Sequence, residues 1–130
     1  MRKKRSLPGL KKDAWKLLSE WIRRKNADEC GTVECYTCGK LLHWKEAHAA
    51  HFVGGRTGSV LLDPRILRVG CYRCNVLLHG NYHQFTLKMI DEVGREKTEE
   101  YLSLKNQTKK WDRSDLEGFI KEYKQRLEGL

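Results

Sequence analysis

Four cysteines stand in two pairs with the same spacing, Cys35 with Cys38 and Cys71 with Cys74. Two residues between the members of a pair let both sulfurs face one point, and two such pairs supply the four ligands of a tetrahedral zinc site. Because a shell of four protein ligands leaves no position for a substrate, a zinc ion held there would be structural. The sequence therefore predicts one structural zinc ion that joins two distant segments of the chain.

The remaining cysteine, Cys30, lies outside this spacing, and we expect it to be an ordinary, partly buried thiol. The basic residues 1–5 are followed by no apolar stretch of the kind that a secretory signal carries. We therefore expect a cytoplasmic protein whose cysteines are reduced and able to bind metal. No apolar run approaches the ~20 residues needed to cross a bilayer, so we expect no membrane partner.

A second pattern lies between and after the cysteine pairs. Ala50-His51-Phe52 and Gly54-Gly55 fall between the pairs, and Asn75 directly follows Cys74. This arrangement resembles the HNH, or ββα-metal, nucleases that contain a zinc-bound treble clef. The resemblance implies a histidine that activates water and a second divalent cation, held partly by the segment after the last cysteine.

The chemistry of phosphodiester hydrolysis fits these residue types. The reaction needs a base that deprotonates water, and an imidazole titrates near neutral pH, so His51 is the candidate general base. It also needs a cation such as Mg²⁺ or Mn²⁺ to neutralise charge on the phosphate, and Asn75 offers an amide oxygen as a ligand. His83 and His48 are further candidate ligands of this catalytic cation.

One position departs from the common HNH pattern. Many HNH proteins carry an acidic residue directly before the central histidine, where this chain has Ala50. His48 or Glu46 could supply the missing ligand. Two plainer interpretations also stay open, since a histidine at the end of a strand is often structural and Asn75 could cap a helix.

The resemblance to one family extends over residues 11–104. The segments that carry it are Ala14–Ser19, Trp21–Arg23, Cys35–Lys40, His43–Glu46, Ala50–Phe52 and Cys71–Asn75, with Gly80-Asn81, Phe85 and Gly94 further on. Together they resemble the NinG (Rap) recombination proteins of lambdoid phages, whose usual form has Gly in place of Ala50. The resemblance implies a structure-specific endonuclease that cuts Holliday junctions and D-loops.

The phage endonuclease VII resolvases are a more distant analogue, with zinc-binding cysteine pairs, a central histidine and an asparagine after the last cysteine. Because those enzymes act as dimers on a symmetric junction, we expect a homodimer. The amphipathic helices predicted at 11–25 and 114–128 are the candidate interfaces.

The composition agrees with a nucleic-acid partner. Lys and Arg number 26 against 17 Asp and Glu, which gives a net charge of +9. This excess predicts attraction to a polyanion. We expect branched DNA to be bound through its phosphates, without reading of sequence. The candidate contact residues are Arg2, Lys3, Lys4, Arg5, Lys45, Arg56 and Arg73.

Charge alone fits three functions equally well. They are a junction nuclease, an HNH nicking or homing-type nuclease with sequence preference, and a non-catalytic zinc module that binds DNA as a recombination accessory. A general base near a metal ligand favours a nuclease over a module. The absence of an added specificity domain within these 130 residues favours recognition of shape over sequence.

The elements that must position these residues follow from the apolar spacing. We expect one α+β domain, with a zinc-bound treble-clef ββα-metal core at 32–93 and flanking N- and C-terminal helices. Asn81 should cap a helix that ends at Gly94, and Ser114 with Glu117 forms the sequence signature of a capping box. The remaining predicted segments are a flexible basic tail (1–10), an N-terminal helix (11–25), strands at 33–36, 41–44, 50–53 and 65–69, and C-terminal helices within 96–128.

Overall fold

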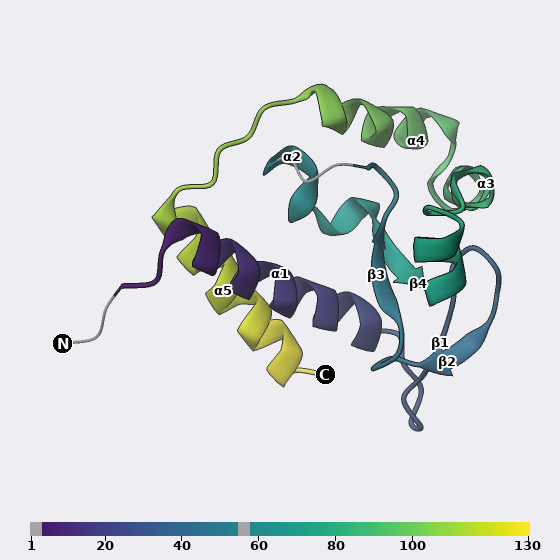
Figure 1. Cartoon of the computed structure of the whole chain (residues 1–130), viewed down its shortest axis with the longest axis horizontal. Helices are drawn as coiled ribbons and strands as arrows, with labels where there is room; N and C mark the ends of the chain where they lie inside the picture. Colours follow the sequence, from purple (N-terminus) through teal and green to yellow (C-terminus); the bar gives the residue numbers. More distant parts are fainter. Residues whose placement is uncertain (1–3, 55–57) are drawn as a thin grey trace.

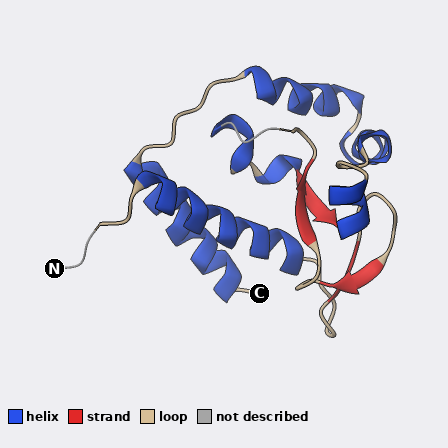
Figure 2. Ribbon diagram, viewed as in Figure 1, coloured by secondary structure: helices blue, strands red, loops and turns tan. Residues whose placement is uncertain are grey.

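The computed structural model describes residues 4–54 and 58–130. Helices and two small sheets make up the fold, which confirms the predicted α+β class. The strands gather near the C-terminal end of the first helix, and further helices follow them in the chain (Figure 2). No helix within the described part of the chain is long and apolar enough to cross a membrane.

Two helices far apart in the sequence lie side by side, α1 (Leu7–Arg24) and α5 (Arg113–Glu128) (Figure 1). Leu18 from α1 and Leu116 from α5 have no exposed surface in the shared core. The apolar faces of both helices therefore meet within one chain. The homodimer, with these helices as its candidate interfaces, stays a prediction.

Helix α1 begins earlier than its sequence pattern predicts. Ser6 is the N-cap, and its hydroxyl accepts a hydrogen bond from the amide of Gly9 at 3.1 Å. Pro8 lies in the first turn, where its missing N–H costs no helical hydrogen bond. The expected flexible tail is therefore helical from Leu7 onward, and residues 1–3 lie outside the described residues.

Two antiparallel hairpins carry the candidate metal ligands and the central histidine. The first pairs β1 (Thr32–Glu34) with β2 (Leu41–His43), and the first cysteine pair lies in its turn. The second pairs β3 (His48–His51) with β4 (Leu67–Gly70). Between them the chain forms two short helical segments, α2 (Gly58–Leu61) and η1 (Pro64–Ile66).

Short helical segments follow the second cysteine pair. A π-helical turn, η2 (Arg73–Leu77), precedes α3 (Tyr82–Val93), and α3 ends at Gly94 as predicted. The chain continues through α4 (Arg95–Leu102) and η3 (Ser103–Asn106), and an extended linker then leads to α5 (Figure 1).

One predicted helix cap is confirmed in position and the other is wrong. Asn81 stands at the N-cap position of α3, but its φ is +48° and its side chain makes no cap hydrogen bond. The capping box of α5 is formed by Asp112 and Asp115, and Ser114 lies inside the helix. Asp112 takes this role because it is the last residue with extended backbone, so its carboxylate faces the unpaired amides of the first turn.

A polar network joins the first hairpin, the second hairpin and α3. Arg68 donates two hydrogen bonds to Glu92, at 3.1 and 2.9 Å, and the Tyr36 hydroxyl donates to the same carboxylate at 2.8 Å. Burial opposes the ionisation of Glu92, but the hydrogen bonds from Arg68 and Tyr36 lower its pKa below the ordinary value. The network therefore fixes both hairpins against one helix.

The packing of α1 on α5 predicts the effect of a truncation. Leu116→Ala should lower the free energy of unfolding by about 2–5 kcal/mol, because it leaves a cavity in a core with no exposed surface. Leu102→Ala, at a position that is 39% exposed, should change it by less than about 0.5 kcal/mol. Urea unfolding followed by circular dichroism measures both. Equal stability of the two variants would contradict the α1–α5 core.

Candidate metal centre and adjoining pocket

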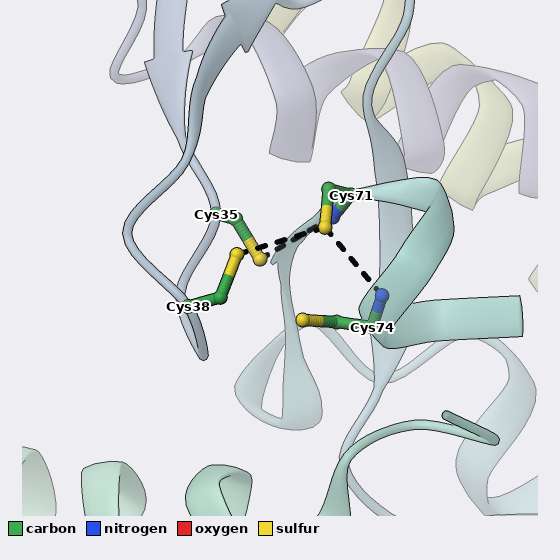
Figure 3. Close-up of side chains that lie close together, drawn as sticks. All are labelled: Cys35, Cys38, Cys71 and Cys74. Carbon is green, nitrogen blue, oxygen red and sulfur yellow. Dashed lines mark hydrogen bonds between the residues drawn. The ribbon is translucent and has the colours of Figure 1, made fainter. Parts of the chain in front are cut away.

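Four sulfur atoms from two segments converge on one point. Cys35 and Cys38 come from the turn of the first hairpin, while Cys71 and Cys74 come from the junction of β4 and η2 (Figure 3). Their Sγ atoms all lie within 4.8 Å of one another. Cys35, Cys71 and Cys74 are buried, and Cys38 is exposed. The four predicted ligands are therefore brought together, and they could hold one structural metal ion such as zinc.

Several N–H groups point at these sulfurs. The amide of Cys71 donates to the sulfur of Cys35 at 3.3 Å, and the amide of Cys74 donates to the sulfur of Cys71 at 3.5 Å. The side-chain amide of Asn81 donates to the sulfur of Cys74 at 3.6 Å. Such donors stabilise negative charge on sulfur, as the thiolate ligands of a metal require. Because the side-chain amide of Asn81 is used in this contact, it makes no cap hydrogen bond to α3.

The four thiols are also linked electrostatically. Burial opposes ionisation of Cys35, but hydrogen bonds from the Thr37 side chain and from backbone amides lower its pKa to about 6. Desolvation and the neighbouring cysteine sulfurs raise the pKa of Cys38 to about 12. Thiolates so close together repel one another unless a cation lies between them, so this donor set fits zinc.

Cys30 takes no part in this cluster. It is exposed, and its amide donates to the carboxylate of Asp28 at 2.9 Å. It is an ordinary thiol outside the cluster, but the expectation that it is partly buried is wrong, because it lies in the turn before β1. It offers a matched control for substitutions of the four clustered cysteines.

A pocket of about 330 Å³ lies beside the cluster. Residues between Trp15 and Tyr82 form its wall, and they include two predicted catalytic residues, His51 and Asn75. The remaining lining residues are Trp15, Ala49, Gly54, Leu61, His79, Gly80 and Tyr82. Among the described residues that line it, none carries a carboxylate, and Glu46, which could have replaced the acidic ligand, is exposed and does not line the pocket.

The ring of His51 contacts Leu61 and Trp15. Its Nε2 lies 3.2 Å from the carbonyl oxygen of Leu61, and since a carbonyl can only accept, the ring nitrogen donates. The indole of Trp15 stacks on the imidazole with 4.9 Å between ring centroids and 19° between planes. Helix α1 therefore reaches the central histidine directly. The sequence predicts Trp15 as an apolar packing residue, and its spacing carries no signal of a partner on β3.

Asn75 lies against a second histidine. Its Nδ2 donates to Nδ1 of His48 at 3.0 Å, and the ring of Tyr72 meets His48 edge-on. The two predicted residues are therefore brought together, as expected. In this arrangement His48 orients the amide of Asn75, because its Nδ1 is already engaged as an acceptor.

His83 does not reach the pocket. It is exposed on α3 and lines a separate hollow with Tyr82, Thr86 and Leu87. His79 lines the pocket instead, with a φ of +51° that turns the chain between η2 and α3. The sequence predicts His83 as a ligand on the helix beyond the break at Gly80, but His83 lies on a different side of that helix from the pocket. The turn at His79 and Gly80 places His79, and not His83, in the pocket lining.

Four of the predicted DNA contacts lie among the described residues, and all four are exposed: Lys4, Arg5, Lys45 and Arg73. Arg5 is paired with Asp13 at 3.0 Å, and the ammonium of Lys45 lies 5.8 Å from the centre of the Trp44 ring. The other three, Arg2, Lys3 and Arg56, lie outside the described residues.

Fold and site together define a small basic α+β protein with a four-cysteine site that could hold zinc beside a histidine-lined pocket. Residues 2–130 match the family described as Bacteriophage Lambda NinG protein, and the chain belongs to this family. Membership suggests a role related to phage recombination. No curated protein and no solved structure matches the chain.

The cluster predicts opposite outcomes for two cysteine substitutions. Cys71→Ser should lower zinc content well below one ion per chain and destabilise the fold, because metal binding energy is folding energy in such a site. Cys30→Ser should keep one zinc ion and wild-type stability. Atomic absorption and thermal unfolding measure both. A metal-free wild type that is fully folded would contradict the assignment.

Proposed function

We propose that this protein is a structure-specific DNA endonuclease that cuts branched recombination intermediates, such as Holliday junctions and D-loops, by metal-dependent hydrolysis of a phosphodiester. The observation that carries the proposal is the fixed orientation of His51 at the wall of a pocket that also contains Asn75 and His79. Family membership supports the recombination context.

The order of the elements supports an HNH, or treble-clef, nuclease. A hairpin bearing the first cysteine pair comes first, a second hairpin bearing His51 follows, and a helical segment then begins at the second pair. This is the order that the resemblance implied for a ββα-metal core. Under the proposal, the zinc site holds the strand of His51 and the segment of Asn75 together.

Under the proposal, His51 would accept the proton of the attacking water. Its Nε2 lies 3.2 Å from the carbonyl oxygen of Leu61, and this contact holds the imidazole in one orientation. The stacked indole of Trp15 holds the ring plane and also favours the imidazolium that forms. Trp15 is thus a positioning residue in this mechanism.

The pocket residues fit a catalytic cation through nitrogen as well as oxygen donors. The amide oxygen of Asn75 and the imidazole of His79 would hold the ion, and His48 would keep the amide oriented. When bound, the cation would neutralise charge on the phosphate during hydrolysis. Mg²⁺ is usually held by carboxylates, which are absent from the described lining, so we expect Mn²⁺ to support cutting better than Mg²⁺.

Exposed basic residues near this region would hold the DNA backbone. Arg73 lies two residues before Asn75, and Lys45 follows the first hairpin. Contacts of this kind bind phosphates and do not distinguish base sequences.

Two histidine substitutions test the catalytic assignment. His51→Ala should lower the rate of cutting of a four-way junction in Mn²⁺ by at least about 100-fold, as expected for a lost general base. The variant should still bind zinc and the junction. His83→Ala, the matched control outside the pocket, should cut at close to the wild-type rate. Gel analysis of a labelled junction, a linear duplex and a supercoiled plasmid measures the activity.

Each result of this assay has a separate meaning. Symmetric cuts in the junction support the proposal, and cutting by His51→Ala refutes the base assignment. Sequence-preferring cuts in linear DNA would indicate a nicking or homing-type nuclease. Absence of cutting on every substrate would indicate a non-catalytic zinc module that binds DNA.

The basic surface predicts a steep dependence of junction binding on salt. Each neutralised phosphate contributes a slope of about −0.9 to the plot of log affinity against log salt concentration. Arg73→Ala should make the slope shallower by about one phosphate contact, whereas Lys97→Ala, on α4 and paired with Glu100, should leave it unchanged. Fluorescence anisotropy at several NaCl concentrations measures the slope. An identical slope in all three proteins would contradict the placement of Arg73 at the DNA.

A further inference from the structure

Large apolar side chains are exposed next to the pocket. Val76, Leu77 and Leu78 are 41%, 59% and 42% exposed, and Tyr82 is 45% exposed. Single exposed apolar residues are common on protein surfaces, but adjacent ones mark a site of interaction. We call Val76, Leu77 and Leu78 the apolar ledge.

The ledge and one wall of the pocket belong to the same segment. Asn75 lines the pocket directly before the ledge, and His79, Gly80 and Tyr82 line it directly after. A molecule that places a reacting group in the pocket must therefore pass beside the ledge. A second protein copy seated on the ledge would obstruct that approach.

The backbone holds the ledge in place. The amide of Leu78 donates to the carbonyl of Arg73 at 2.8 Å, and the amide of Gly80 donates to the carbonyl of Cys74 at 2.9 Å. Both bonds tie the segment to the cysteine cluster. The ledge is therefore presented by a fixed turn, and its side chains do not collapse onto the core.

Charge identifies the kind of partner. The sequence has no Asp or Glu between Asp63 and Asp91, whereas Arg73 lies next to the ledge and Lys88 follows on α3. The positive charge of these two residues attracts a polyanion. A second copy that met this surface through a two-fold axis would bring like charges together, which disfavours a dimer there.

We propose that the apolar ledge packs against unstacked bases at the branch point of DNA whose backbone lies in the pocket. The inference rests on the proposed function and extends it, because it explains how a basic protein distinguishes a branch from a plain duplex. Phosphates are contacted by charged groups, but the faces of bases are apolar and are exposed where stacking is interrupted. An uncharged ledge beside the pocket fits those faces.

The test uses a four-way junction with 2-aminopurine at its branch point, whose fluorescence rises when the base unstacks. The zinc-loaded full chain is added with Ca²⁺ and without Mn²⁺ or Mg²⁺, so that the DNA stays intact. Wild type should raise the fluorescence of the junction and leave a matched linear duplex unchanged. With the double variant Leu77→Ser/Leu78→Ser the fluorescence should not rise, and the ratio of junction affinity to duplex affinity should fall about tenfold.

Leu102→Ser, an exposed leucine on α4, is the matched control and should behave as wild type. Zinc content and circular dichroism of the double variant should equal those of wild type, because both leucines are exposed. An unchanged fluorescence rise in the double variant overturns the proposal. So does tight junction binding by wild type with no rise, or a dimer that the double variant converts to monomers while the rise persists.

Failure of the proposed function is distinguishable from failure of the ledge. Addition of Mn²⁺ to the same complex tests cutting. A wild type that raises the fluorescence but never cuts would refute the endonuclease and leave the ledge supported, whereas cutting without a rise would refute the ledge alone.

Discussion

The close approach of four cysteine sulfurs is the constraint on which this structure depends. Thiolates that lie within 4.8 Å of one another repel unless a cation lies between them, and the amides of Cys71 and Cys74 are directed at the sulfurs of Cys35 and Cys71. The two segments that meet there are a hairpin turn and the end of a strand. A metal ion bound there would join the first hairpin to the end of β4, in addition to the network of Tyr36, Arg68 and Glu92.

The pocket depends on the same cluster. Asn75 follows the last ligand directly, and Asn81 reaches back to the sulfur of Cys74, so the segment between them is anchored at both ends. The opposite wall comes from α1, where Trp15 stacks on His51, and α5 packs along the length of α1. The terminal helices therefore support the pocket from one side while the cysteine cluster supports it from the other.

The sequence predicts best where chemistry fixes both residue type and spacing. The four cysteines, the first hairpin and the end of α3 at Gly94 follow from local rules. The contact of Trp15 with His51 does not, because an apolar residue at helical spacing fits any core equally well. The place of His79 in the pocket lining does not follow from local rules either, since left-handed backbone at a non-glycine residue has no clear sequence signal. Asp112 and Ser114 are both suitable N-cap residues by type, so only the observed start of α5 at Arg113 identifies Asp112 as the cap.

The central claim is that the cysteine cluster creates a place for a second cation in the adjoining pocket. It is tested most directly by adding small amounts of Mn²⁺ to the zinc-loaded protein and following the imidazole NMR signals of all five histidines. Paramagnetic broadening should affect His48, His51 and His79 at lower Mn²⁺ concentration than His43 and His83. Uniform broadening of all five signals, or earliest broadening of His83, would contradict the account.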